Sequence, residues 1–147
     1  FAVADYIKNK EFKKFKLLNK HEVVFKDNDY TQKNIRIQKS SIIKINKNND
    51  YEEVRINLGA MGTLDLNPNI MDHFYEAYTF FYQLLHNKKF QIEFKLKAGD
   101  IFCFDNRRVL HGRKEFDPNS GNRHLQGYYI EREEIISKLN YLNGIKF

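Results

Sequence analysis

The residue types that could perform chemistry gather in two late stretches, 102–113 with the sequence FCFDNRRVLHGR and 123–129 with the sequence RHLQGYY. His111 stands beside Gly112, whose missing side chain permits close approach to a ligand. Arg123 opens the second stretch 12 residues later (123 − 111). Imidazole binds metal ions, and the planar guanidinium bonds a carboxylate in two places. The pair could therefore serve one cavity, although a lone histidine is more often an ordinary polar residue.

Three expected strands must position these side chains. Apolar and polar residues alternate over 90–97, which predicts a strand with one buried face. The turn 98–100 then leads into a short apolar strand over 101–104. A strand over 123–130 follows the turn-forming residues 117–121. In an antiparallel arrangement of these strands, the side chains of the two late stretches face each other.

The preceding residues are expected to form the scaffold. Asn67 and Pro68 are a strong helix start, because the asparagine can cap and the proline suits the first helical position. We expect a helix from there to about His86, with its aromatic stripe packed on a sheet. The other expected elements are one or two amphipathic helices over 2–20, a strand over 21–25, a hairpin of strands 34–45 and 51–58 around a turn at 46–50, and a closing helix over 132–142.

Many short strands, turn signals and one long helix predict an α+β fold, mainly β with helices, in which mostly antiparallel strands form a sandwich or jelly roll. The chain has 147 residues, 41% of them hydrophobic and 15% aromatic, which suits one domain over 1–147. We expect no nucleic-acid partner despite the net charge of +6, because the lysines are interleaved with acidic residues. A basic nucleic-acid-binding domain remains an alternative.

Two further observations bear on where the protein works. Cys103 is the single cysteine, so an intrachain disulfide is impossible and a reducing compartment is expected. We expect its side chain to pack in the core. No apolar run approaches the roughly 20 residues of a membrane-spanning helix. The sequence therefore predicts a cytoplasmic protein with no membrane partner.

The two late stretches resemble a known family, the iron(II) and 2-oxoglutarate dependent dioxygenases of the taurine dioxygenase group. The residues FDNRRVLHGR (104–113) and RHLQGYY (123–129) look especially like the gamma-butyrobetaine and trimethyllysine hydroxylase branch. The similarity extends loosely over nearly the whole chain and is dense from about Phe94 to Glu133. The resemblance implies part of a double-stranded β-helix. It also implies iron(II) bound by a His-x-Asp pair and a later histidine, with 2-oxoglutarate as co-substrate and a quaternary amine as the small-molecule substrate.

By the same resemblance, His111 matches the later iron-binding histidine and Arg123 the arginine that holds the distal carboxylate of 2-oxoglutarate. Tyr129 matches an aromatic position beside a trimethylammonium group, which cation-π attraction favours. Asp105, Asn106 and Arg108 match positions that support the iron and its co-substrate, and Asn106 and Arg108 are expected among the cofactor-binding residues.

The sequence also departs from the family pattern. None of its five histidines begins a His-x-Asp or His-x-Glu pair. The resemblance places that pair upstream of Phe1, and the chain does not begin with methionine, so we expect a fragment of a carnitine-biosynthesis-like hydroxylase. In this branch an adjacent asparagine pair often stands where 57–60 reads NLGA, which leaves the substrate open. We expect the isolated chain to be inactive and to bind neither iron nor 2-oxoglutarate. The alternative is a non-catalytic jelly-roll binding module, and exposed sheet edges predict a homo-oligomer in either case.

Overall fold

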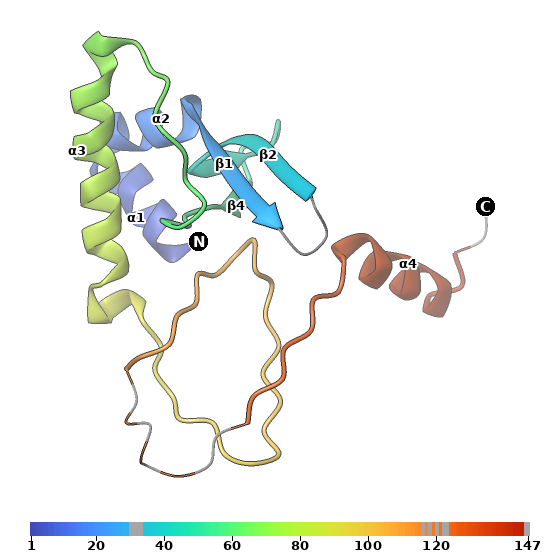
Figure 1. Ribbon diagram of the computed structural model, residues 1–147. Helices are drawn as coiled ribbons and strands as arrows, with labels where there is room; N and C mark the ends of the chain where they lie inside the picture. The colour runs from blue at the N-terminus through green and yellow to red at the C-terminus, as the bar shows by residue number, and fades with distance from the viewer. Residues whose placement is uncertain (30–33, 116, 118, 120, 122–123, 146–147) are drawn as a thin grey trace. The chain divides into compact units, whose positions relative to one another are not determined.

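The computed structural model describes residues 1–29, 34–115, 117, 119, 121 and 124–145. It divides into two compact units, 1–112 and 113–147, and each is described here by itself (Figure 1). The elements of the first unit are α1 (Ala2–Lys10), α2 (Phe12–Lys20), β1 (Glu22–Asp29), β2 (Asn34–Ser41), β3 (Ile43–Ile45), β4 (Tyr51–Val54), α3 (Pro68–Leu85) and the 3-10 helix η1 (Lys88–Phe90). The second unit contains α4 (Arg132–Leu142).

Helices α1 and α2 form where apolar residues recur at three- and four-residue steps, as predicted. The helical conformation is interrupted between α1 and α2 at Glu11, whose φ of −137° and ψ of 55° lie outside the helical region. Ile7 of α1 and Phe15 and Leu18 of α2 are buried. The lysines of these helices are exposed or half-buried, and the ammonium of Lys8 lies 5.7 Å from the centre of the Phe15 ring.

Helix α3 begins as the sequence predicts. The side chain of Asn67 accepts a hydrogen bond from the backbone N–H of Asn69 at 2.9 Å, and Pro68 occupies the first helical position. Phe74, Ala77 and Phe81 are buried on one face of the helix. This face packs mainly against α2 and α1, so the expectation that the helix lies on a sheet is corrected (Figure 1). The reason is that α2 itself contacts β2 and β3 and lies on the sheet side of α3.

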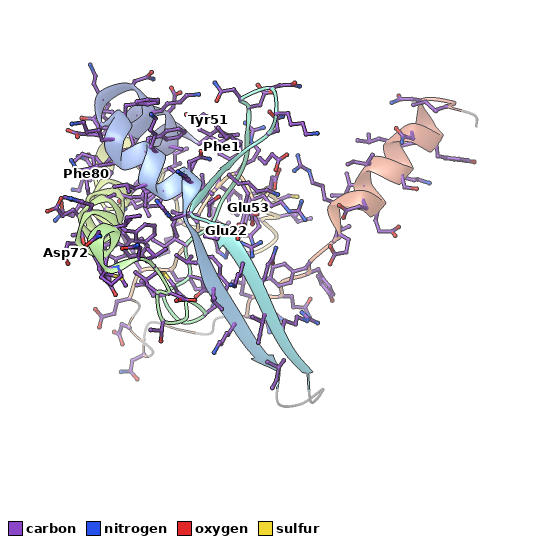
Figure 2. All side chains as sticks on the ribbon, turned by 90° about the horizontal axis from the view of Figure 1, so that it is seen from above. Phe1, Glu22, Tyr51, Glu53, Asp72 and Phe80 are labelled. Atoms are coloured by element: carbon purple, nitrogen blue, oxygen red, sulfur yellow. The ribbon has the colours of Figure 1, made fainter. Side chains whose placement is uncertain are left out.

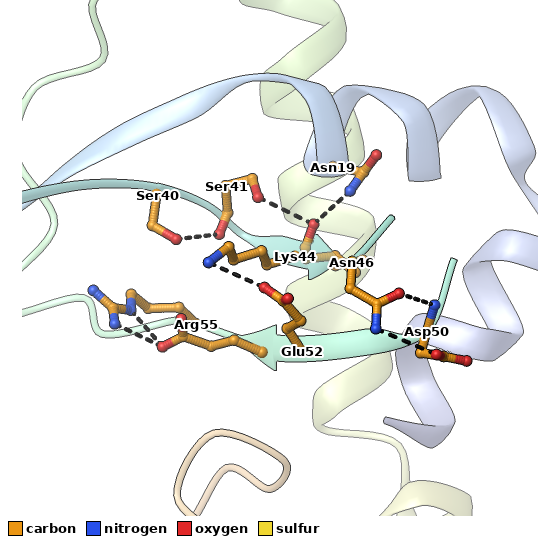
Figure 3. Close-up of polar contacts among 10 residues, drawn as sticks. Asn19, Ser40, Ser41, Lys44, Asn46, Asp50, Glu52 and Arg55 are labelled. Carbon is orange, nitrogen blue, oxygen red and sulfur yellow. Dashed lines mark hydrogen bonds and ion pairs between the residues drawn. The ribbon is translucent and has the colours of Figure 1, made fainter. Parts of the chain in front are cut away.

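The described strands form two antiparallel pairs, β1 with β2 and β3 with β4. Strand β1 continues to Asp29, beyond the end predicted at Phe25, and pairs with β2 in register from Glu22–Ser41 to Asp29–Asn34. The predicted turn between β3 and β4 is confirmed. Asn46 Oδ1 accepts a hydrogen bond from the backbone N–H of Asp50 (Figure 3). It also accepts one from the backbone N–H of Asn48, and Asn49 has a positive φ of 68°.

Polar contacts join the first helices to the strands. The Asn19 side-chain amide on α2 and the Ser41 hydroxyl both donate to the backbone oxygen of Ile43, at 2.9 and 3.1 Å (Figure 3). Arg55, just after β4, donates twice to Glu53 Oε1 and once to Gln38 Oε1 of β2. The bond between Arg55 and Gln38 connects the two strand pairs. The hydrophobic core of the unit is formed by Val3, Ala4, Ile7, Phe15, Leu18, Val23, Phe25, Ile42, Ile43, Val54, Phe74, Ala77 and Phe81.

The prediction of strands over 90–97 and 101–104 is wrong. In this part of the chain the structure has η1 and then an extended backbone without a paired strand. The predicted turn between them does form, with Asp100 Oδ2 accepting from the Lys97 N–H at 2.7 Å and Gly99 at a φ of 89°. Alternation alone does not make a strand, because the backbone groups need a neighbour to bond. Ile92 and Ile101 are 89% and 95% exposed, and Cys103, expected in the core, is also exposed.

The second unit confirms the closing helix α4 with the predicted bounds. The strand predicted over 123–130 is not present among its described residues 124–130, and Arg123 lies outside the described part of the chain. The mixed α+β class and the antiparallel pairing are therefore confirmed, whereas the partial jelly roll and the single domain stay predictions. In the described ranges, no helix has both the length and the apolar character needed to cross a membrane.

Candidate functional site

A single tight turn organises the motif. The backbone oxygen of Asp105 accepts from the N–H groups of Arg108 at 3.0 Å and Val109 at 3.2 Å. The carboxylate of the same residue accepts from the Arg107 N–H at 3.0 Å. Asp105 therefore acts on this turn as a capping residue acts on a helix, by bonding backbone donors that would otherwise lack partners. The sequence DNRRV, expected to end a strand in a polar turn, reverses the chain locally.

The turn 105–109 is fixed to the body of the first unit by backbone groups. The backbone N–H of Val54 donates to the Arg107 oxygen at 2.9 Å, next to the end of β4. The Phe1 amino group donates to the Arg108 oxygen at 3.1 Å, and the Arg108 guanidinium lies 5.3 Å from the centre of the Phe1 ring. Phe1, which precedes α1, and Val54, the last residue of β4, thus hold the turn from two sides.

The charge environment at this anchor is perturbed. The Phe1 ring lies 5.3 Å from that of Tyr51, which Figure 2 labels beside it. Burial raises the pKa of Tyr51 to about 12, with further contributions from the charge of Asp5 and a hydrogen bond to it.

His111 lies two residues beyond the turn and its side chain is exposed. Its imidazole packs against the ring of Phe104, with centroids 4.7 Å apart and a 55° angle between the planes. Phe104 in turn contacts Phe102 at 5.0 Å, and Phe102 contacts Phe94 at 4.8 Å. The four rings form a continuous series, called here the aromatic ladder, that ends at the imidazole.

The structure places the predicted site residues in three groups. Asp105, Asn106, Arg108 and His111 lie together on the motif turn and just after it, with Asn106 exposed and Arg108 engaged with Phe1. Tyr129 belongs to the second unit and is 87% exposed. Arg123, predicted to hold a carboxylate, lies outside the described residues. The roles predicted for these residues remain predictions.

The described residues do not by themselves fit a complete iron site. Within the described ranges, no group of three or more His, Cys, Asp or Glu side chains is placed to hold a metal ion. His111 can offer one imidazole nitrogen, which suits one position of a ligand set with histidine and carboxylate donors.

Two shallow depressions lie on α3, with volumes of about 600 and 450 Å³, and neither contains a predicted site residue. The first is lined by charged and aromatic side chains that include Lys14, Asp72 and Phe80, the last two labelled in Figure 2. The second lies between Leu58–Leu64 and the tyrosines Tyr75 and Tyr78. The two depressions therefore belong to the scaffold.

Sequence reasoning missed the residues that hold the motif. Phe1 and Val54 bond the turn through backbone groups, for which the sequence carries no signal. Phe104 does have one, since Phe102 and Phe104 share a side of the chain by their spacing of two and precede the aspartate of the turn. Aromatic residues with this spacing beside a histidine are a detectable pattern.

Comparisons with known proteins agree with the motif. The model of the family described as "Taurine catabolism dioxygenase TauD, TfdA family" matches residues 1–129. A gamma-butyrobetaine dioxygenase from Pseudomonas sp. strain AK-1 is 32% identical over 139 residues, which are 95% of this chain and 36% of that protein. Human gamma-butyrobetaine dioxygenase is 28% identical over 145 residues, 97% of this chain and 38% of that protein.

A trimethyllysine dioxygenase from the yeast Meyerozyma guilliermondii is 33% identical over 104 residues, 69% of this chain and 25% of that protein. The chain spans about a third of the length of the first two relatives and a quarter of the third.

Proposed function

Because the chain belongs to the TauD/TfdA dioxygenase family and matches gamma-butyrobetaine and trimethyllysine dioxygenases over most of its length, we propose that it forms part of the catalytic domain of an iron(II) and 2-oxoglutarate dependent dioxygenase. The substrate class is a small quaternary amine, as the names of these relatives suggest. The observation that carries the proposal is the family match over 1–129, which includes the anchored turn and His111.

Five residues carry the proposed roles. His111 supplies one imidazole to iron, with the remaining ligands coming from outside the described residues. Arg123 bonds the distal carboxylate of 2-oxoglutarate through its planar guanidinium. Tyr129 offers an aromatic face to the quaternary ammonium, which can donate no hydrogen bond. Asn106 and Arg108 support the co-substrate. When bound, iron and 2-oxoglutarate supply the oxygen chemistry of hydroxylation.

A chimeric enzyme tests this function. The matching segment of the Pseudomonas gamma-butyrobetaine dioxygenase is replaced by this chain, and succinate formation is measured with iron(II), 2-oxoglutarate and gamma-butyrobetaine. We expect turnover that His111→Ala and Arg123→Ala abolish and that Asp72→Asn, on the exposed side of α3, leaves intact. A folded chimera whose turnover survives both alanine substitutions would contradict the proposal.

The isolated chain is expected to form no succinate, because a single histidine does not hold iron in a defined geometry. The assay is the same, run with the chain alone and with excess iron(II). Succinate formation that disappears in His111→Ala would show that the chain is self-sufficient and would overturn this part of the proposal.

Association of two or more copies is a second proposal, favoured by the apolar side chains exposed on the extended segment after η1. Ile92 and Ile101 are 89% and 95% exposed, which is unusual for isoleucine. We expect sedimentation equilibrium to give a mass above that of one chain, and Ile92→Lys with Ile101→Lys to lower it. A monomer at all concentrations would argue against association.

A further inference from the structure

The aromatic ladder is separate from the hydrophobic core of its unit. Phe94, Phe102 and Phe104 do not belong to the buried cluster that α1, α2, α3 and the strands share. Phe94 and Phe102 are about half exposed, at 55% and 51%, and only Phe104 is more covered. These rings contact one another in series, in edge-on and tilted arrangements, and the last ring in the series is the imidazole of His111.

The backbone around the ladder explains why Phe104 and His111 meet. Phe104 directly precedes Asp105, whose carboxylate and carbonyl close the turn, and His111 follows that turn by two residues. The turn is held at Arg107 and Arg108 by hydrogen bonds from Val54 and Phe1. With both chain directions fixed at the turn, the ring of Phe104 lies against the imidazole in a tilted contact, with the centroids 4.7 Å apart.

From this geometry we propose that Phe104 is the positioning residue of His111, with Phe102 and Phe94 holding the Phe104 ring in turn. The proposal rests on the function proposed above, in which His111 binds the metal. A ring whose plane is already fixed loses less rotamer freedom when it binds, so positioning favours binding before any new contact forms. Phe104 contacts the imidazole at a tilt of 55°, and His111 as a whole remains exposed.

The test uses the chain itself and measures by NMR the Hα–Hβ couplings of His111, called here the His111 signals, which report how far its χ1 angle is held in one rotamer. The ring protons are not used, because loss of the ring 4.7 Å away would shift them without any reorientation. We expect Phe104→Leu to move the His111 signals toward the average of a freely rotating histidine. Phe104→Tyr keeps an aromatic ring and should retain the signals, and Phe102→Leu should move them by a smaller amount in the same direction.

The matched control is Phe12→Leu, which removes a half-exposed ring that stacks on Phe15 in α2, remote from the ladder. It should leave the His111 signals in place. Backbone amide spectra verify that each variant keeps the core. Unchanged His111 signals in a folded Phe104→Leu variant would overturn the proposal, as would an equal shift in Phe12→Leu.

The outcome is independent of the chimera assay. If the chimera lacks activity while Phe104→Leu still releases the imidazole, the function fails and the positioning stands. If the chimera is active and Phe104→Leu leaves the imidazole unchanged, the function stands and the positioning fails. In an active chimera, Phe104→Leu should raise the iron(II) concentration needed for half-maximal rate, and Phe104→Tyr should restore it.

Discussion

The hydroxyl of Tyr51 lies 3.3 Å from Oδ1 of Asp5, a contact that joins the first strand residue of β4 to α1 across 46 positions of sequence. This contact supports the residues that hold the motif turn, because the Tyr51 ring packs on the Phe1 ring and the Phe1 nitrogen donates to the Arg108 backbone oxygen. Helix, strand and motif turn thus meet at one cluster of side chains.

The Tyr51 contact predicts a pH dependence. The pKa of this phenol is raised from 10.0 to about 12, so the unfolded state loses its proton first as the pH rises. Its contribution to stability is therefore complete below about pH 10 and lost between pH 10 and 12. Spectrophotometric titration should show one tyrosine that ionises late. Asp5→Asn should lower its pKa only in part, since burial is the larger cause, and Asp72→Asn should not change it.

The Arg55 cluster predicts a difference between two ion pairs. Arg55 Nε and a terminal nitrogen bond Glu53 Oε1 at 2.8 and 2.6 Å, and the Glu53 side chain is only 14% exposed. Arg55→Met leaves that carboxylate without its main partner and should lower the unfolding free energy by about 1–3 kcal/mol. Lys44→Met removes the Lys44–Glu52 pair, which is about half exposed, and should cost about 1 kcal/mol or less. Urea unfolding measures both, and equal losses would contradict the burial argument.

Substitutions at two phenylalanines, one in the core and one in the extended segment, should have different effects on stability. Phe74 is fully buried on α3, so Phe74→Ala should lower the unfolding free energy by about 3–5 kcal/mol. Phe94 is 55% exposed, and its replacement by alanine should cost about 1 kcal/mol or less. Thermal and urea unfolding give the comparison. A loss at Phe94 that matches the loss at Phe74 would mean that the segment is buried in solution.

The start of α3 predicts a smaller effect. Asn67 accepts the Asn69 N–H through its side chain, so Asn67→Ala should destabilise the protein by about 1 kcal/mol. Asn67→Ser keeps an oxygen that can accept the same bond and should be nearly neutral. Circular dichroism during urea unfolding reports the helix. A neutral Asn67→Ala variant would show that packing of Phe74 and Phe81 alone fixes the start of the helix.

The helices could be predicted because their signals are local. Asn67 and Pro68 mark the start of α3, and a 3.6-residue repeat of apolar side chains marks the faces of α1, α2 and α4. Each helix satisfies its own backbone, so a short stretch of sequence contains most of the information. The turn at Asn46 was predictable for the same reason.

The strands over 90–104 were not predictable in this way. Phe90, Ile92 and Phe94 alternate with polar residues, but strand formation depends on a second strand that the pattern does not identify. Helix α3 was likewise expected on a sheet but packs against α2 and α1, because an apolar helix face does not determine which element will cover it. Partner choice is a property of the whole fold and is weakly encoded in any one segment.

In the candidate site, too, local features could be predicted from the sequence and long-range contacts could not. The position of His111 beside a turn was visible from Asp105, Asn106 and Gly112, whereas the contacts from Phe1 and Val54 arrive from more than 50 positions away. Phe104 is an intermediate case. Its spacing of two from Phe102 is visible in the sequence, whereas its contact with the imidazole could not be predicted. The role of Arg123 still rests on the family resemblance.

The bonds that hold the motif turn are accepted by peptide oxygens of Arg107 and Arg108, and neither requires a particular side chain at those positions. The turn can therefore keep its place while the residues displayed on it diverge. Evolution of a new substrate preference in such a segment is free to alter the charge and shape that it presents, as long as Asp105 closes the turn and the peptide groups remain.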